Sequence, residues 1–224
     1  MQLLRNVEYR TGVSPASFAF LPPMALLVLV RHGESTANLA NVFTGWLDVA
    51  LSPTGEAEAH AVAEKLHAFH FEAAYTSTLA RAERTLAIIL TTIGQTTIPV
   101  HRTQALRERM YGDLQGLNKA EVTLKYGQEQ VDTWRRSYDV APPNGESLQQ
   151  TQTRTVKYYE QEMAPNLRRG QNLLLVAHGN TLRGLRMYLE KLTPVQVASL
   201  EIVTGSVHVY RLDTQLAIVE MYNL

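Results

Sequence analysis

The sequence contains no cysteine among its 224 residues, which excludes disulfides, a thiol nucleophile and thiolate zinc sites. It also lacks an excess of charge of either sign, because 21 lysines and arginines balance 21 aspartates and glutamates. Balanced charge gives no support to nucleic acid as a partner, so the arginines have to be interpreted by their positions. No apolar run reaches the roughly 18 residues that a membrane span needs, and we expect no membrane association.

The first 23 residues have an ambiguous composition. Arg5 and Arg10 precede the apolar residues 18–21, as in a signal peptide, but prolines at positions 22 and 23 break that stretch. Cleavage there would damage the strand that follows, so we reject secretion and expect a cytoplasmic protein. An organelle-targeting peptide is the alternative, and Glu8 counts against it. We interpret residues 1–23 as an N-terminal extension of unknown role, followed by a single domain at residues 24–224.

The order of the expected elements is typical of an α/β fold. Short apolar strands are expected at residues 26–30, 73–76, 97–100, 172–177, 207–212 and 216–222. Helices are expected to begin near Ser52, Thr78, Ser147, Thr181 and Thr193. Strands that alternate with helices predict a three-layer sandwich, in which a mostly parallel central sheet carries helices on both faces. Residues 106–146 are polar and aromatic with little periodicity, so we expect a cap segment laid over the sheet.

Two histidines follow apolar strands in the same way. Arg31, His32 and Gly33 come directly after residues 26–30, and His178 and Gly179 come directly after residues 172–177. Ligands of open α/β sheets collect at the carboxyl ends of the strands, so we expect both histidines to share one site. An isolated Arg-His-Gly would favour a structural histidine by roughly two to one. The doubled arrangement instead favours phosphoryl chemistry.

A phosphoryl group is dianionic, and its transfer needs fixed cationic donors and an in-line nucleophile. A neutral and oriented His32 imidazole could be that nucleophile and form a phosphohistidine. Arg31, Arg81 and His178 are the candidates for the clamp on the phosphoryl oxygens, since guanidinium offers paired donors that lysine lacks.

The reaction also needs a proton shuttle, for which Glu108 is our candidate. From composition alone, a carboxylate among cations is more often a salt-bridge partner, and Glu34 is an alternative shuttle close to His32 in sequence. Lys119, Arg135 and Arg136 form a second cationic set, although an isolated Arg-Arg pair is a solvated helix face in roughly three cases of four. The sequence contains no metal-binding motif such as His-Glu-x-x-His.

These residues, in this order, resemble the histidine phosphatase superfamily, and more narrowly the 2,3-bisphosphoglycerate-dependent phosphoglycerate mutases. The resemblance covers residues 26–222. An Arg-His-Gly motif specifies only the superfamily, whereas the block from 106 to 138 singles out the mutases. The matching stretches are Leu29–Thr36, Asn41–Trp46, Tyr75–Leu79 with Arg81, Glu108–Gly112, Leu114–Lys119, Tyr126–Gly127, Trp134–Tyr138, Gly145–Leu148, Ala177–Asn180 and Pro194–Gly205.

The resemblance implies a glycolytic and gluconeogenic isomerase that interconverts 3-phosphoglycerate and 2-phosphoglycerate, with 2,3-bisphosphoglycerate as the primer and no metal. His32 would be the phosphorylated nucleophile, Glu108 the proton donor and acceptor, and Arg31, Arg81 and His178 the clamp. A homodimer or homotetramer is also implied, although no sequence stripe identifies an interface. The residues expected to bind the rest of the substrate are Asn38, Thr44, Gly45, Arg109, Tyr111, Lys119, Arg135, Arg136, Gly179 and Asn180.

Two other functions are alternatives to the mutase. The first is a phosphomonoesterase that uses the same His32 and Glu108 but releases phosphate from small metabolites to water. The segment between Tyr138 and Gly145 is short and the chain ends at Leu224, so less chain covers the site than in longer members. We therefore expect water to reach the phosphoenzyme more easily, without loss of the mutase reaction. The second, a non-catalytic phosphate-binding module, is least favoured because nucleophile, acid and clamp are all present.

Overall fold

The computed structural model of this protein describes residues 24–224. The expected N-terminal extension at residues 1–23, and with it the question of a targeting peptide, lies outside the described residues. No helix within residues 24–224 is both long enough and apolar enough to cross a membrane.

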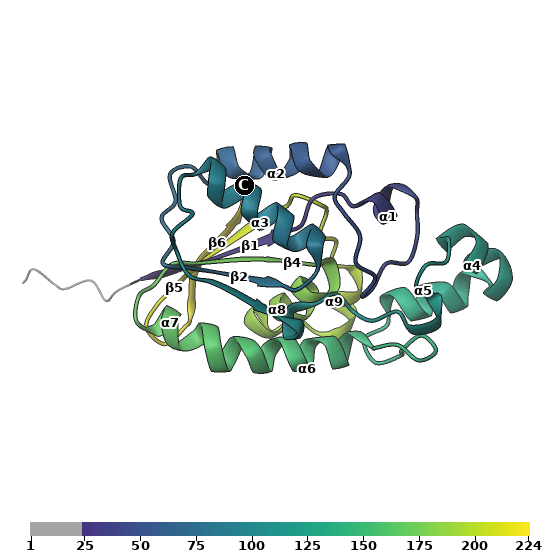
Figure 1. Ribbon diagram of the computed structural model, residues 1–224. Coiled ribbons are helices and arrows are strands. Elements are labelled where there is room, and N and C mark those ends of the chain that lie inside the picture. The colour runs from purple at the N-terminus through teal and green to yellow at the C-terminus, as the bar shows by residue number, and fades with distance from the viewer. Residues whose placement is uncertain (1–23) are drawn as a thin grey trace, which may run out of the picture.

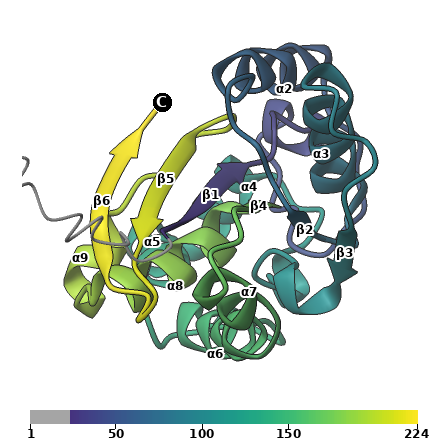
Figure 2. The ribbon, with the colours of Figure 1, turned by 90° about the vertical axis from the view of Figure 1, so that its left-hand side faces the viewer.

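The described residues form a sheet of six strands in the order β3-β2-β4-β1-β5-β6 (Figure 2). The first four strands in the chain run parallel, β5 is antiparallel to β1, and β6 is antiparallel to β5. This mostly parallel sheet confirms the expected α/β class. The strands are β1 (Ala25–Arg31), β2 (Ala73–Ser77), β3 (Val100–Thr103), β4 (Leu173–Ala177), β5 (Val207–Leu212) and β6 (Ile218–Asn223).

Helices cover both faces of the sheet, as the three-layer prediction requires (Figure 1). One face carries α2 (Pro53–Lys65) and α3 (Ala80–Thr92). The other face carries α6 (Leu148–Tyr158), the π-helix η3 (Tyr159–Met163), α7 (Ala164–Arg168) and α8 (Gly179–Glu190). Alternate residues of β1 enter the two cores, since Leu27 and Leu29 pack with the second layer and Val28 and Val30 with the first. Burial on both sides explains why this strand is continuously apolar.

Local capping chemistry sets several helix starts close to the predicted positions. The Ser52 hydroxyl accepts from the Gly55 amide, and Pro53 is the first residue of α2. Ser147 forms a capping box at the start of α6, and Thr193 does the same for α9 (Pro194–Ser199). The third strand was expected at residues 97–100, but β3 begins at Val100, where it pairs with Ala74 of β2.

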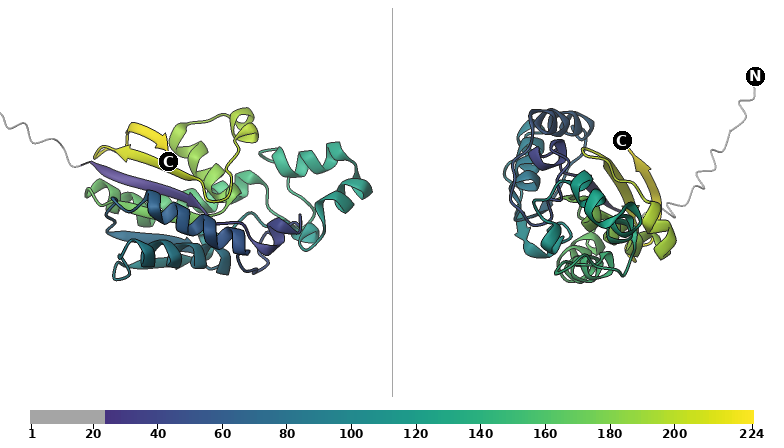
Figure 3. Two further views of the ribbon diagram at one scale, coloured as in Figure 1. Left: turned by 90° about the horizontal axis from the view of Figure 1, so that it is seen from above. Right: turned by 90° about the vertical axis from the view of Figure 1, so that its right-hand side faces the viewer.

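Residues 104–146 lie beyond the carboxyl ends of the parallel strands (Figures 1 and 3). They contain two helices that the weak periodicity did not predict, α4 (Lys119–Tyr126) and α5 (Gln128–Arg136). Short 3-10 turns precede them, η1 (Gln104–Leu106) and η2 (Gly112–Leu114). Val122, Val131 and Trp134 of these helices bury their side chains against Phe43 and Leu114 in a separate small core. Phe43 follows the short helix α1 (Thr36–Leu39), so the first segment after β1 anchors the cap.

Candidate active site

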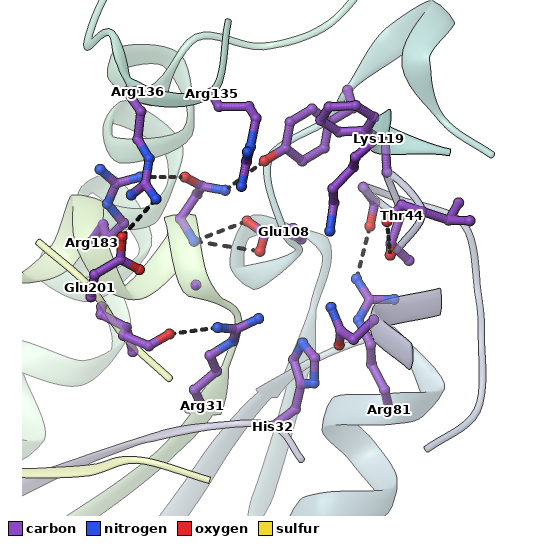
Figure 4. Close-up of a pocket in the computed structure, with 18 of the residues that line it drawn as sticks. Arg31, His32, Thr44, Arg81, Glu108, Lys119, Arg135, Arg136, Arg183 and Glu201 are labelled. Carbon is purple, nitrogen blue, oxygen red and sulfur yellow. Dashed lines mark hydrogen bonds and ion pairs between the residues drawn. The ribbon is translucent and has the colours of Figure 1, made fainter. Parts of the chain in front are cut away.

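A cavity lies at the carboxyl ends of β1 and β4, between the sheet and the cap (Figure 4). The register of these two strands pairs Val30 with Val176 and Arg31 with Ala177. The next residue of each strand is a histidine, and the rings of His32 and His178 are in edge contact with their centroids 4.9 Å apart. The two strand-end histidines are therefore brought together, as the sequence predicted.

The His32 ring is held in a single tautomer. Its Nδ1 lies 2.7 Å from the carbonyl oxygen of Gly33, which can only accept, so Nδ1 carries the proton and Nε2 keeps its lone pair. Burial lowers the pKa of the His32 imidazole well below its ordinary value, and the charges of Arg81 and Arg31 lower it further. His32 is thus a neutral imidazole at pH 7 with a free lone pair, as a nucleophile requires.

His178, the third residue expected in the phosphoryl clamp, is completely buried and is not among the residues that line the cavity. Its Nε2 lies 2.7 Å from the Ser77 hydroxyl, while its Nδ1 is without a hydrogen-bond partner among the described residues. Burial lowers the pKa of His178 well below its ordinary value, followed by the charges of Arg81 and the neighbouring imidazole. His178 therefore supports His32 as a second neutral ring at the same strand ends.

Two guanidinium groups flank His32, that of the half-buried Arg31 and that of the buried Arg81 (Figure 4). Arg31 donates to the carbonyl of Ile202 at 2.5 Å, and its Nε is buried without a partner in the described chain. Arg81 donates to the carbonyls of Leu47 and Gly45 at 3.0 and 2.8 Å. Burial lowers the pKa of Arg81 to about 10, which leaves it charged at neutral pH. Because these bonds go to neutral carbonyls, the guanidinium charges remain available to a bound anion.

Glu108 lies across the cavity from His32 (Figure 4). One carboxylate oxygen accepts from the backbone amides of Arg109 at 2.7 Å and Asn180 at 3.1 Å. The second of these amides belongs to the first turn of α8, where the helix dipole favours negative charge. Glu34, the alternative shuttle, accepts from the Ser52 hydroxyl at 2.6 Å and does not line the cavity. Geometry therefore favours Glu108 over Glu34.

The cap side of the cavity is strongly cationic. Lys119, Arg135 and Arg136 all line it, and burial followed by the charge of Arg135 lowers the pKa of Lys119. Arg136 also forms an ion pair of 2.6 Å with Glu201, which lines the cavity too. In total, six arginine and lysine side chains and two carboxylates line the cavity. The excess of positive charge fits a ligand that carries several anionic groups.

Most of the residues expected to bind the rest of the substrate do line this cavity: Asn38, Thr44, Gly45, Tyr111, Lys119, Arg135, Arg136, Gly179 and Asn180. Arg109 is not among the lining residues. It is fully buried behind Tyr111, with its guanidinium 4.7 Å from the ring centroid and 3.0 Å from the hydroxyl. Burial by itself would raise the pKa of Tyr111, but the Arg109 charge and hydrogen bonds reverse this, and the net pKa is lowered.

Sequence reasoning missed Arg183, which lines the cavity from α8. Its guanidinium donates to the side-chain oxygen of Asn180 at 3.1 Å and to the carbonyls of Val197 and Ala198 at 2.6 and 2.8 Å. Burial lowers the pKa of Arg183 to about 10, so it stays charged. The available signal was its spacing, since a residue three positions after Asn180 shares its helix face. Other lining residues that were missed are Val42, Phe43, Leu200, Glu201 and Ile202.

A neutral strand-end histidine between fixed guanidinium groups, facing a carboxylate, defines a histidine-dependent phosphoryl-transfer site. A family profile described as "Histidine phosphatase superfamily (branch 1)" matches residues 27–224. The chain belongs to this superfamily and, within it, to the family of the 2,3-bisphosphoglycerate-dependent phosphoglycerate mutases. The resemblance seen in the sequence is confirmed.

Proteins described as 2,3-bisphosphoglycerate-dependent phosphoglycerate mutases are close in sequence. One from Cytophaga hutchinsonii is 52% identical over 86% of this chain and 90% of its own length. One from Nitrobacter winogradskyi is also 52% identical, over 89% of this chain and 97% of its own length. Among solved structures, a mycobacterial glucosyl-3-phosphoglycerate phosphatase superposes with a TM-score of 0.73 at 26% identity, over 89% of this chain and 97% of that one.

Proposed function

We propose that this protein interconverts 3-phosphoglycerate and 2-phosphoglycerate through a phosphohistidine at His32. The observation that carries the proposal is the division of the cavity into two cationic parts. Arg31 and Arg81 surround the nucleophile, while Lys119, Arg135 and their neighbours line the cap side. A phosphoglycerate carries a phosphate and a carboxylate, so two cationic parts match its two anionic ends.

The primer 2,3-bisphosphoglycerate suits the same cavity, because six cationic side chains there can bind its phosphates and carboxylate. The Nε–H group of Arg31 also has no hydrogen-bond partner within residues 24–224. When bound, it supplies the phosphoryl group that His32 carries. His32 Nε2 forms the bond to phosphorus as the bond from phosphorus to the sugar-acid oxygen breaks. Glu108 donates a proton to the departing oxygen and takes one from the hydroxyl that attacks in the reverse step.

The cap matters to the choice between mutase and phosphomonoesterase. A general phosphatase would need His32 and Glu108 but no second cationic part fitted to a glycerate. We assign the catalytic function to residues 24–224 as one domain with the cap at about 106–146, and we place the reaction in the cytoplasm.

Within residues 24–224 no group of three or more histidine, aspartate or glutamate side chains is arranged to hold a metal ion. The metal-free reaction and the homodimer or homotetramer remain predictions.

The direct test is a coupled assay of 2-phosphoglycerate formation from 3-phosphoglycerate in the presence of a chelator. We expect turnover that 2,3-bisphosphoglycerate stimulates, that resists the chelator and that disappears in His32→Ala. Acid-labile phosphate on the wild-type chain, absent from the variant, would identify the phosphohistidine. Steady release of inorganic phosphate without isomer formation would establish the phosphomonoesterase instead, and inactivity in both assays would support a binding module.

A further inference from the structure

The segment that carries Glu108 has no regular secondary structure of its own. Residues 107–111 lie between η1 and η2 and belong to no helix or strand. Helical backbone bonds occur only at the two ends, where the Arg107 amide donates to Gln104 and the Tyr111 carbonyl accepts from Leu114. The position of the Glu108 carboxylate therefore depends on groups outside the segment. Misplacement of a proton donor by about 1 Å can cost on the order of a hundredfold in rate, so whatever fixes this backbone affects catalysis.

Several side chains bond the backbone of this segment. The Trp46 indole donates to the Glu108 carbonyl and the Thr181 hydroxyl to the Arg107 carbonyl, each at 2.7 Å, and the Arg154 side chain makes the largest number of these bonds. The guanidinium of Arg154, on α6, donates to two carbonyls of the segment, Arg107 at 2.8 Å and Glu108 at 2.9 Å, and to the Ala105 carbonyl just before it at 2.9 Å. It is itself held by a paired interaction with the Glu146 carboxylate, with both N–O distances at 2.9 Å. A planar guanidinium has enough donors in fixed directions to make all these bonds at once, which an ammonium group does not.

Glu146 fastens the other side of the segment. Its second oxygen accepts from the Met110 amide at 3.0 Å and from the Thr151 hydroxyl at 3.2 Å. Burial would raise the pKa of Glu146, but the hydrogen bonds and charge of Arg154 lower it overall, so the group stays ionised. The side chains of Arg154 and Glu146 are about 20% exposed, so solvent screens this pair less than a surface pair.

Neither Arg154 nor Glu146 lines the cavity, so neither is in a position to touch the substrate. We propose that the Arg154–Glu146 pair is a positioning device that fixes the Glu108 carboxylate for proton transfer. The proposal rests on the function proposed above, in which Glu108 protonates the departing oxygen. It predicts a defect that is specific to steps that need this proton.

The leaving group of the substrate provides a test. A glycerate oxygen leaves as a poor alkoxide unless it is protonated, whereas nitrophenolate leaves without a proton. We would measure kcat and KM for 3-phosphoglycerate. With p-nitrophenyl phosphate as the second substrate, we would measure the rate of the initial nitrophenolate burst, which reports the phosphorylation of His32. The variants are Arg154→Met, Arg154→Lys and Glu146→Gln, with Glu108→Gln as reference. Arg84→Met is the matched control, since it removes an exposed ion pair with Glu56 on the other layer.

For Arg154→Met we expect kcat with 3-phosphoglycerate to fall at least tenfold while KM and the nitrophenolate burst stay within twofold. Arg154→Lys should not restore kcat, and Arg84→Met should behave as wild type. The double variant Arg154→Met/Glu108→Gln should lose no more than Glu108→Gln alone, because both changes remove the same proton transfer. If Arg154→Met fails to fold by circular dichroism, Glu146→Gln should show the same pattern in weaker form.

The proposal would be overturned if Arg154→Met lowered kcat with 3-phosphoglycerate and the nitrophenolate burst equally, or lowered neither. Additive losses of kcat in the double variant would overturn it too, because Arg154 would then be a structural residue only. Failure of the proposed function is distinguishable from these results. In that case wild type would form no 2-phosphoglycerate, or Glu108→Gln would itself not discriminate between the two leaving groups.

Discussion

Because His32 and His178 are both neutral in the fold, the free energy of unfolding should depend on pH by an amount that can be calculated. Only 3% of His32 and none of His178 is exposed, and burial and the nearby arginines lower the pKa of both imidazoles well below the ordinary value. In the unfolded chain each imidazole takes up a proton as the pH falls through about 6.5. In this range the unfolded state therefore binds more protons than the folded state, and the free energy of unfolding falls as the pH is lowered.

The size of the effect follows from linkage. Each imidazole that stays neutral in the fold lowers the free energy of unfolding by about 1 kcal/mol between pH 6.5 and 5.5, with a limiting slope of about 1.4 kcal/mol per pH unit. The pair should therefore account for about 2 kcal/mol over this interval. Above about pH 7.5 the contribution should be flat. His208, whose pKa burial also lowers, adds to the total in wild type and variants alike.

Urea denaturation at half-unit steps from pH 5.5 to 8 would measure this dependence. We expect His178→Gln to remove about 1 kcal/mol of the change between pH 6.5 and 5.5, whatever it does to the absolute stability. His67→Gln is the matched control, because it removes an exposed histidine far from the site. If His178→Gln has the same slope as wild type, the imidazole is protonated in the fold, and the tautomer argument for His32 loses its electrostatic basis.

Three further predictions concern single residues. Arg183→Met should raise KM for 3-phosphoglycerate by roughly tenfold or more in steady-state kinetics, because it removes a buried charged donor from the cavity. Glu201→Gln should lower KM by about two- to fivefold at low salt, since its carboxylate competes with substrate for Arg136 in a largely exposed pair, and the difference should vanish at high salt. An added Cβ at Gly33 would lie 2.1 Å from the carbonyl oxygen of Gly55, so Gly33→Ala should lower the free energy of unfolding by about 3 kcal/mol in urea denaturation.

The parts of the fold that the sequence predicted are those governed by local chemistry or by burial on both faces. β1 and β4 are continuously apolar because each is covered by helices on two sides. The starts of α2, α6 and α9 follow from hydroxyl side chains that bond to amides within three residues. Helices α4 and α5 were missed because they are short and their apolar residues pack against Phe43 and Leu114, far away in sequence.

The same distinction applies to the site. The two histidines could be paired from the sequence because parallel strands end at one edge of a sheet. Whether an arginine faces the cavity is a tertiary property, and the sequence does not distinguish Arg109, buried behind Tyr111, from Arg183, which lines the cavity. Arg154 was missed for a similar reason, since its partners at residues 105–108 are some 46 to 49 positions away.

The positive charges around His32 both keep its imidazole neutral and stabilise the transferred phosphoryl group. Arg31 and Arg81 are bonded to backbone carbonyls, and within the described part of the chain neither forms an ion pair with a carboxylate. In the absence of a ligand, this positive potential opposes protonation of the imidazole and keeps Nε2 available for attack. When a phosphoryl group is present, the same potential stabilises the charge that develops on its equatorial oxygens. Replacing either arginine should therefore weaken both nucleophile and clamp, and the loss in rate would exceed what a lost binding contact alone explains.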